Sequence, residues 1–333
     1  MNYNEHYYRI KSTFPNLDLV KESEFDLFHN IESARETIKF CIELSENASK
    51  KLNIDLCFGV EYLQLINACA KVKYNSAAII FNSGLIDKLD KIALISVDIF
   101  MKETVASLTI SGETKDKMKE IVKSCCITYL FYHELAHVLQ LSHIHVKAEI
   151  EKKLQEKYSD IKCFEIKNHI YEIDADKFGA GMSAYMFLEY IMDQDSKLET
   201  ILLFNGLTLL LFSIANIIIE FSGDLFQNIY YKEYSHPHPY IRIMNCKEQI
   251  LSFISKNLNL SAQFSNAVLQ RSGGMISQIG YSDDRIIDYG MLFFESQEQI
   301  LDYTKEIEVL DNNYSELVKH RVQQIFNKLT IHN

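Results

Sequence analysis

The sequence predicts a mainly α-helical protein with a small β-sheet. Glycine and proline, the residues that most disfavour helices, are scarce, because the 333-residue chain contains only 11 glycines and 3 prolines. Apolar residues recur at helical spacing in several long segments. One short apolar run, Ser76 to Phe81, is typical of a strand. We therefore expect an α+β fold in which helices are in the majority.

In the first third of the chain, apolar residues between Ser23 and Leu52 predict one or two surface helices. Gly59 to Val72 is more apolar and is expected to be buried. The strand candidate follows, and Asn82-Ser83-Gly84 at its end predicts a turn. Lys91 to Leu108 is apolar at nearly every position, so its secondary structure stays open.

A long helix is expected from about Thr114 to Gln140. Residues 124–132 carry no charge, so this helix must be enclosed on every side. The charged segment Val146 to Ile161 predicts a solvated helix, and Gly273-Gly274 predicts a turn in the tail. Three further helices are expected: Asn168 to Tyr190, Thr200 to Ile219, and one that begins with Pro239 at its first position.

We expect three regions along the chain. Residues 1–110 form an N-terminal helical region with one or more short edge strands. Residues 111–255 form the core that carries the chemistry. Residues 256–333 form a C-terminal helical region, which can be continuous with that core.

Charge and cysteine content narrow the class of protein. The net charge of −11 argues against binding to nucleic acid, because neutralising phosphates requires clustered lysine and arginine. The seven cysteines are an odd number without CxxC spacing, which is typical of reduced thiols. Met1 to Leu17 has no continuous apolar stretch and so no visible secretory signal. We expect a cytoplasmic protein.

Thr200 to Ile219 is uncharged over a length that can span a bilayer, roughly 20 residues. Polar residues within it, such as Asn205 and Asn216, dilute its hydrophobicity. A single crossing would also place the residues before and after it on opposite sides of a membrane. We therefore interpret the segment as a buried core helix and expect no membrane association.

The motif with the clearest chemistry is His133-Glu134-Leu135-Ala136-His137. Histidines four residues apart project from one face of a helix, so their ring nitrogens can share one tetrahedral zinc ion. Glu134 then lies beside the open coordination position, where it can accept a proton from water.

A catalytic zinc needs a third protein ligand, and the sequence offers two candidates. His143 stands ten residues after His133, but this spacing requires a glycine at position 140, where Gln140 stands. Glu172, the other candidate, precedes Asp176 by four residues, so both carboxylates project from one face of a helix. We favour Glu172 as the ligand, with Asp176 accepting the N–H of a zinc-bound histidine.

Three motifs occur in order: HExxH at His133 to His137, Glu-x-x-Ala-Asp at Glu172 to Asp176, and His236-Pro237 followed by Arg242-Ile243. This order resembles the gluzincin metalloproteases of the CAAX-processing and heat-shock membrane protease group. It is also similar to the soluble Lit phage-exclusion proteases, in which a long apolar helix likewise leads into HExxH.

The resemblance implies a zincin-like (gluzincin) core with extra helices, and Zn²⁺ as the cofactor. Carried over by position, it implies three zinc ligands, which are His133, His137 and Glu172. It also implies Glu134 as the general base and Asp176 as the carboxylate behind a ligand histidine. His236 corresponds to the histidine that stabilises the transition state in the membrane proteases. We expect Arg242 to position His236.

The sequence thus predicts a zinc metalloendopeptidase that hydrolyses peptide bonds of a protein substrate. If Ala77 to Phe81 is an exposed edge strand, it can align the substrate backbone by strand addition. Lit proteases cleave a translation elongation factor when a phage peptide appears. The resemblance therefore implies phage defence, with an elongation factor as substrate and a peptide as activator.

The alternative from another class is a non-enzymatic helical interaction protein with a structural or degenerate metal site. A structural zinc normally has four protein ligands, and the sequence offers three good ones.

Overall fold

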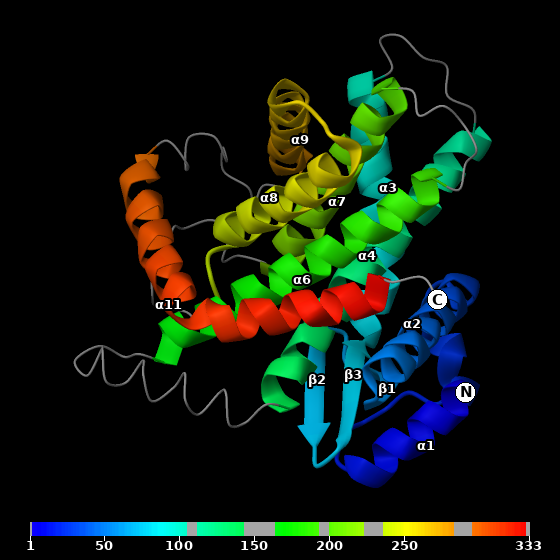
Figure 1. Ribbon diagram of the computed structural model, residues 1–333. Coiled ribbons are helices and arrows are strands. Elements are labelled where there is room, and N and C mark those ends of the chain that lie inside the picture. Colours follow the sequence, from blue (N-terminus) through cyan, green and yellow to red (C-terminus); the bar gives the residue numbers. More distant parts are fainter. Residues whose placement is uncertain are drawn as a thin grey trace.

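The computed structural model describes residues 2–104, 112–142, 164–192, 200–222, 236–282 and 295–330. Within these ranges helices predominate and one three-stranded sheet lies at the N-terminal end of the molecule (Figure 1), which confirms the expected mainly helical α+β fold. A short 3-10 helix, Glu22–Leu27, follows the first α-helix. The other elements are α1 (Tyr3–Thr13), α2 (Ile31–Leu52), β1 (Asp55–Glu61), β2 (Ala68–Lys73), β3 (Ser76–Asn82), α3 (Ser83–Thr104), α4 (Gly112–Ser142), α6 (Phe164–Met192), α7 (Thr200–Ser222), α8 (Pro239–Leu258), α9 (Ala262–Ser282) and α11 (Gln297–Thr330).

The sheet has the strand order β1-β3-β2, with β1 parallel and β2 antiparallel to the central strand β3. The prediction that Ala77 to Phe81 is an edge strand is therefore wrong, because β3 has a partner on both sides. The edge strand next to the HExxH motif is β2, which packs against α4. The turn predicted at Asn82-Ser83-Gly84 is also wrong, since α3 begins directly at Ser83.

Two buried polar side chains attach α1 to the sheet. The Tyr3 hydroxyl accepts a 3.3 Å hydrogen bond from the backbone N–H of Val60 in β1 and donates a 2.7 Å bond to the carbonyl of Val20. The backbone N–H of Phe58, also in β1, donates a 3.0 Å bond to His6 Nδ1. His6 is fully buried, and burial lowers its pKa to about 4. The neutral imidazole, with Nδ1 as acceptor, is therefore the form that the fold selects.

The predicted apolar helix at Thr200 to Ile219 is α7, and it lies in the core. Among the described residues it is the one helix long and apolar enough to cross a membrane, and 72% of that segment is buried inside the molecule. Its polar residue Asn216 donates a 3.0 Å hydrogen bond to Ser96 Oγ of α3. Tertiary packing thus accounts for its composition, whereas the cytoplasmic location remains a prediction.

The C-terminal elements confirm one local prediction and correct another. Helix α8 begins with Pro239 at its first position, and His238 caps it by accepting the N–H of Tyr240. Gly273 and Gly274 do not form the expected turn, because both lie inside α9. Residues 146–161, expected as a solvated helix, lie outside the described residues. The three-region division of the chain remains a prediction.

We expect His6 to make stability depend on pH below neutrality. The unfolded chain binds a proton on this histidine near pH 6.5, whereas the folded protein does so only near pH 4. Stability from His6 is therefore complete above pH 6.5 and decreases as the pH falls towards 4, by about 2–3 kcal/mol. Denaturant unfolding from pH 7 to 4 measures this loss.

The matched variant is His6→Asn, whose Oδ1 can accept the Phe58 N–H without titrating. Its free energy of unfolding should fall less steeply over the same range. Identical pH profiles for the native protein and His6→Asn would contradict the assignment.

Candidate metal centre

Helix α4 places the HExxH motif in the interior of the molecule. Of the uncharged residues 124–132, which we expected to be enclosed, 125–132 are buried and Ser124 is half-buried. His133 and Glu134, which follow, are buried as well. The helix packs against α6, α3, α7 and strand β2 (Figure 1). A pair of imidazoles at this position is therefore largely enclosed by protein and lines the cleft described below.

A glycine in α6 sets the distance between α4 and α6. A methyl group at Gly179 would lie 2.5 Å from the carbonyl oxygen of Tyr129 and 3.2 Å from the backbone nitrogen of His133. The helices can approach this closely only because Gly179 has no side chain. Asp176 and Glu172, one and two turns earlier in α6, consequently face His133 across the same contact.

Three potential metal ligands converge at this crossing. His133, His137 and Glu172 each offer one ligand atom, and these atoms all lie within 4.8 Å of one another. His133 Nε2 and His137 Nε2 are 3.1 Å apart. Glu172 approaches His137 Nε2 to 3.3 Å through Oε1 and His133 Nε2 to 3.5 Å through Oε2.

These separations fit a small cation. A tetrahedral ion with bonds of about 2.0–2.1 Å holds its ligand atoms roughly 3.3–3.4 Å apart. The two Nε2 atoms are 3.1 Å apart, and Glu172 approaches His137 to 3.3 Å through one oxygen and His133 to 3.5 Å through the other, which is close to that value. The cluster of two nitrogens and one carboxylate could therefore hold a metal ion.

Asp176 lies directly behind the first histidine and is fully buried. Its Oδ1 is 3.0 Å from His133 Nδ1 and accepts a 2.7 Å hydrogen bond from the Tyr129 hydroxyl. Arg242 of α8 donates two further bonds of 2.8 Å, one to each carboxylate oxygen. Burial raises the pKa of Asp176, but Arg242 outweighs it and holds the pKa far below its usual range.

Charge in the site is arranged to hold a cation. Burial lowers the pKa of His133, but contacts with Asp176 and Glu172 outweigh it and raise the pKa to about 10. Burial also lowers the pKa of His137, but the contact with Glu172 outweighs burial and raises this pKa. Burial raises the pKa of Glu172, yet the two imidazoles hold it well below its usual range. A metal ion binding here would take the place of protons on the imidazoles.

Glu134 lies beside the ligand cluster without belonging to it. Its side chain is 7% exposed and lines the same cleft as the three ligands. Burial raises the pKa of Glu134, and the neighbouring imidazoles oppose that shift. A carboxylate with a raised pKa can exchange a proton near neutral pH more readily than an exposed one.

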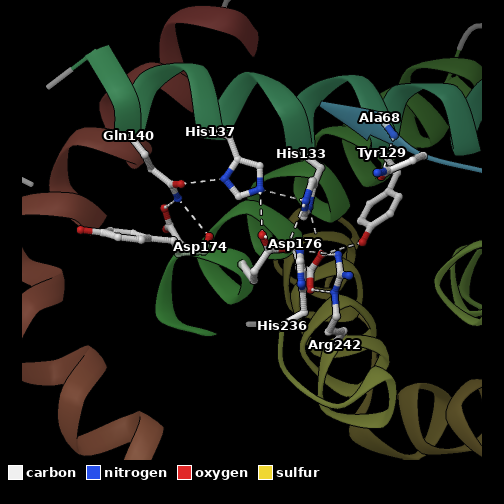
Figure 2. Close-up of polar contacts among 12 residues, drawn as sticks. Ala68, Tyr129, His133, His137, Gln140, Asp174, Asp176, His236 and Arg242 are labelled. Carbon is white, nitrogen blue, oxygen red and sulfur yellow. Dashed lines mark hydrogen bonds and ion pairs between the residues drawn. The ribbon is translucent and has the colours of Figure 1, made fainter. Parts of the chain in front are cut away.

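The other two predicted residues, His236 and Arg242, also reach the site. Nε2 of His236, which is labelled in Figure 2, lies 3.4 Å from Glu172 Oε1. The His236 side chain is 56% exposed. Burial of the rest of the ring lowers its pKa, which favours the neutral imidazole. Arg242, bonded to Asp176, also lies 3.7 Å from Glu172 Oε2.

Two neighbours of the ligands were not foreseen from the sequence. Tyr129 supports Asp176, as described, and stands one helical turn before His133. Gln140 stands one turn after His137, and its Oε1 lies 2.8 Å from His137 Nδ1. Both follow the i, i+3 or i, i+4 spacing on α4, which is a signal that the sequence does contain. His143, the rejected ligand candidate, lies outside the described residues.

A cleft of about 300 Å³ opens over the ligands. One wall is formed by β2 with Ala68, Cys69 and Ala70, and another by apolar side chains of α4 and α7, including Leu130 and Phe221. The three ligands and Glu134 also line it. The ligand cluster thus lies at the wall of an open cleft.

No protein-family model, curated protein or solved structure matches this chain.

Substituting Gly179 should separate α4 from α6. In Gly179→Ala the new methyl group meets backbone, which cannot rotate away, so we expect destabilisation by about 1–3 kcal/mol and weaker metal binding. Gly273→Ala is the matched control, because no heavy atom lies within 4 Å of its added methyl group. The control should stabilise α9 by about 0.5–1 kcal/mol. Thermal unfolding with bound-metal analysis measures both, and equal behaviour of the two variants would contradict the close approach.

Removing the charge of Glu172 should release the metal. Glu172→Gln keeps the side-chain shape but replaces a carboxylate ligand with a weakly coordinating amide, so metal affinity should fall by at least about 100-fold. Glu248→Gln, at an exposed position on α8, is the control and should bind metal as the native protein does. Elemental analysis after dialysis against a competing chelator measures retention. Full retention by Glu172→Gln would exclude it as a ligand.

Proposed function

We propose that the protein is a zinc-dependent endopeptidase with a gluzincin-type catalytic core. The observation that carries the proposal is the convergence of His133, His137 and Glu172 at 3.1–3.5 Å, with the Glu134 carboxylate beside them in an open cleft. Zinc prefers nitrogen and oxygen ligands in tetrahedral geometry, and three protein ligands leave a fourth position for water or substrate. A structural zinc would instead use four protein ligands.

Glu134 performs the proton transfers in this proposal. A zinc ion supplies a Lewis acid that polarises the scissile carbonyl and acidifies the attacking water. Glu134 accepts the proton of that water and then delivers it to the leaving amine. Its burial suits both steps, because a raised pKa brings the carboxylic acid closer in acidity to its reaction partners.

His236 stabilises the developing oxyanion in this proposal. Its Nε2 lies 3.4 Å from Glu172 Oε1, and its partly exposed side chain lines the cleft. Burial lowers the pKa of His236, which favours a neutral ring that donates a hydrogen bond from its N–H. Arg242 acts indirectly in this proposal, because its two hydrogen bonds hold Asp176 against His133.

Strand β2 is the element that can align a substrate backbone. The backbone N–H of Asn82 donates to the carbonyl of Asn67. Because hydrogen-bonded pairs alternate along an antiparallel ladder, Cys69 and Lys71 also direct their backbone groups towards β3. Ala68 and Ala70 therefore direct their backbone groups away from β3, and both line the cleft. The Ala68 N–H already donates a 2.9 Å hydrogen bond to Asn67 Oδ1. An extended peptide that pairs with this edge by strand addition would therefore use the carbonyl of Ala68 and the backbone groups of Ala70.

The substrate class follows from the resemblance to Lit proteases and forms part of the proposal. A translation elongation factor would be the target, with a phage peptide as the activating signal. The charge of the whole protein, −11, gives no support to nucleic acid as a partner.

We expect Glu134→Gln to retain zinc and to lose cleavage, because the amide can fill the same space but cannot accept the proton. Cells expressing the native chain and cells expressing the variant are compared by proteomics for new peptide termini. Glu120→Gln, an exposed position on the same helix, is the control and should give the native pattern. Termini found with the native protein and with Glu120→Gln, but not with Glu134→Gln, identify the substrate.

Two results would overturn the proposal. A zinc-loaded Glu134→Gln protein that cleaves as well as the native one would remove Glu134 as the base. A native protein that binds no zinc would remove the mechanism altogether.

A further inference from the structure

The second histidine ligand has a neutral partner that the proposed mechanism does not use. His137 turns Nε2 towards His133 and Glu172, and its Nδ1 lies 2.8 Å from Gln140 Oε1 (Figure 2). With Nε2 committed to the ligand cluster, the hydrogen of the neutral ring must be on Nδ1. Gln140 Oε1 is then its acceptor.

The amide of Gln140 is itself fixed by α6. Its Nε2 donates to the carbonyl oxygen of Tyr171 at 3.0 Å and to Asp174 Oδ2 at 3.1 Å. Both hydrogens of the amide nitrogen thus have acceptors, so the oxygen is the end that faces His137. The orientation follows from the neighbours of the nitrogen and does not depend on His137.

We propose that Gln140 is a positioning residue that fixes the tautomer and ring angle of His137 for metal binding, with Asp174 and the Tyr171 carbonyl holding Gln140 in place. The inference rests on the proposed metal site but not on peptidase activity. It assigns a role to Asp174, the acidic residue of α6 that points away from Glu172 and Asp176.

The difference between the two histidine partners has a chemical consequence. His133 lies against a carboxylate, Asp176, whereas His137 lies against an amide. Hydrogen bonding to a carboxylate raises the basicity of a ligand imidazole. A neutral partner on the second histidine limits the negative charge around the metal, and a less negative site acidifies water more strongly.

The first test replaces the acceptor. In Gln140→Leu, zinc affinity measured by chelator competition should fall by roughly 10–100-fold. The Nδ1–H signal of His137, observed by NMR of the zinc-loaded, ¹⁵N-histidine-labelled full chain, should exchange with solvent faster than in the native protein. The corresponding signal of His133, which has a different partner, should keep its native exchange rate.

The second test separates positioning from a contact that merely joins α4 to α6. Gln140→Glu sets a carboxylate against Asp174 and should lose affinity like Gln140→Leu. Adding Asp174→Asn restores a donor to the new carboxylate, so the double variant should regain the His137 Nδ1–H signal and recover affinity to within about threefold of native. Thermal unfolding of the metal-free proteins reports any purely structural loss.

The outcomes are distinct. Native zinc affinity with an unchanged His137 signal in Gln140→Leu would overturn the inference and leave the proposed function standing. Loss of stability in the metal-free variants, without rescue of the signal in the double variant, would also overturn it and show a structural contact only. A native chain without zinc affinity would overturn the metal site and the inference together, whereas zinc binding without cleavage would refute only the peptidase.

Discussion

The buried carboxylate of Asp176 is the point on which the site depends. It joins three helices, because it accepts hydrogen bonds from Tyr129 of α4 and Arg242 of α8 while belonging to α6. A buried charge without partners would cost several kcal/mol, so the three helices are stable together only when these bonds form. His133 lies against the same carboxylate and is oriented by it. Correct folding and correct ligand geometry are therefore coupled.

Packing sets the distances between the site residues, and charge sets their protonation states. Gly179 lets α4 and α6 approach until backbone meets backbone, which fixes the distance between the histidines and Glu172. Electrostatics then sets the protonation states, since Arg242 keeps Asp176 ionised and the carboxylates favour positive charge on the imidazoles. Neither factor alone would produce a cluster that prefers a cation.

The sequence was informative where chemistry depends on spacing within one helix. Histidines four residues apart, and Glu172 four residues before Asp176, share a face whatever the rest of the fold does. The sheet was harder to predict, because β2 alternates weakly and acquires its place only by pairing with β3. The role of Gln140 beside His137 was also hard to predict, and the sequence indicates only that this residue does not bend the chain. Its contacts come from α6, which is distant in sequence.

An ion shared by His137 and Glu172 would join positions that are far apart in the chain. It would act as a reversible cross-link, present in the native state and absent from the unfolded ensemble. Ion concentrations a thousandfold above the dissociation constant would add about 4 kcal/mol to stability, a substantial fraction of what holds a typical domain together. The supply of metal would then govern how long each molecule survives in the cell, independently of whether it ever meets a substrate.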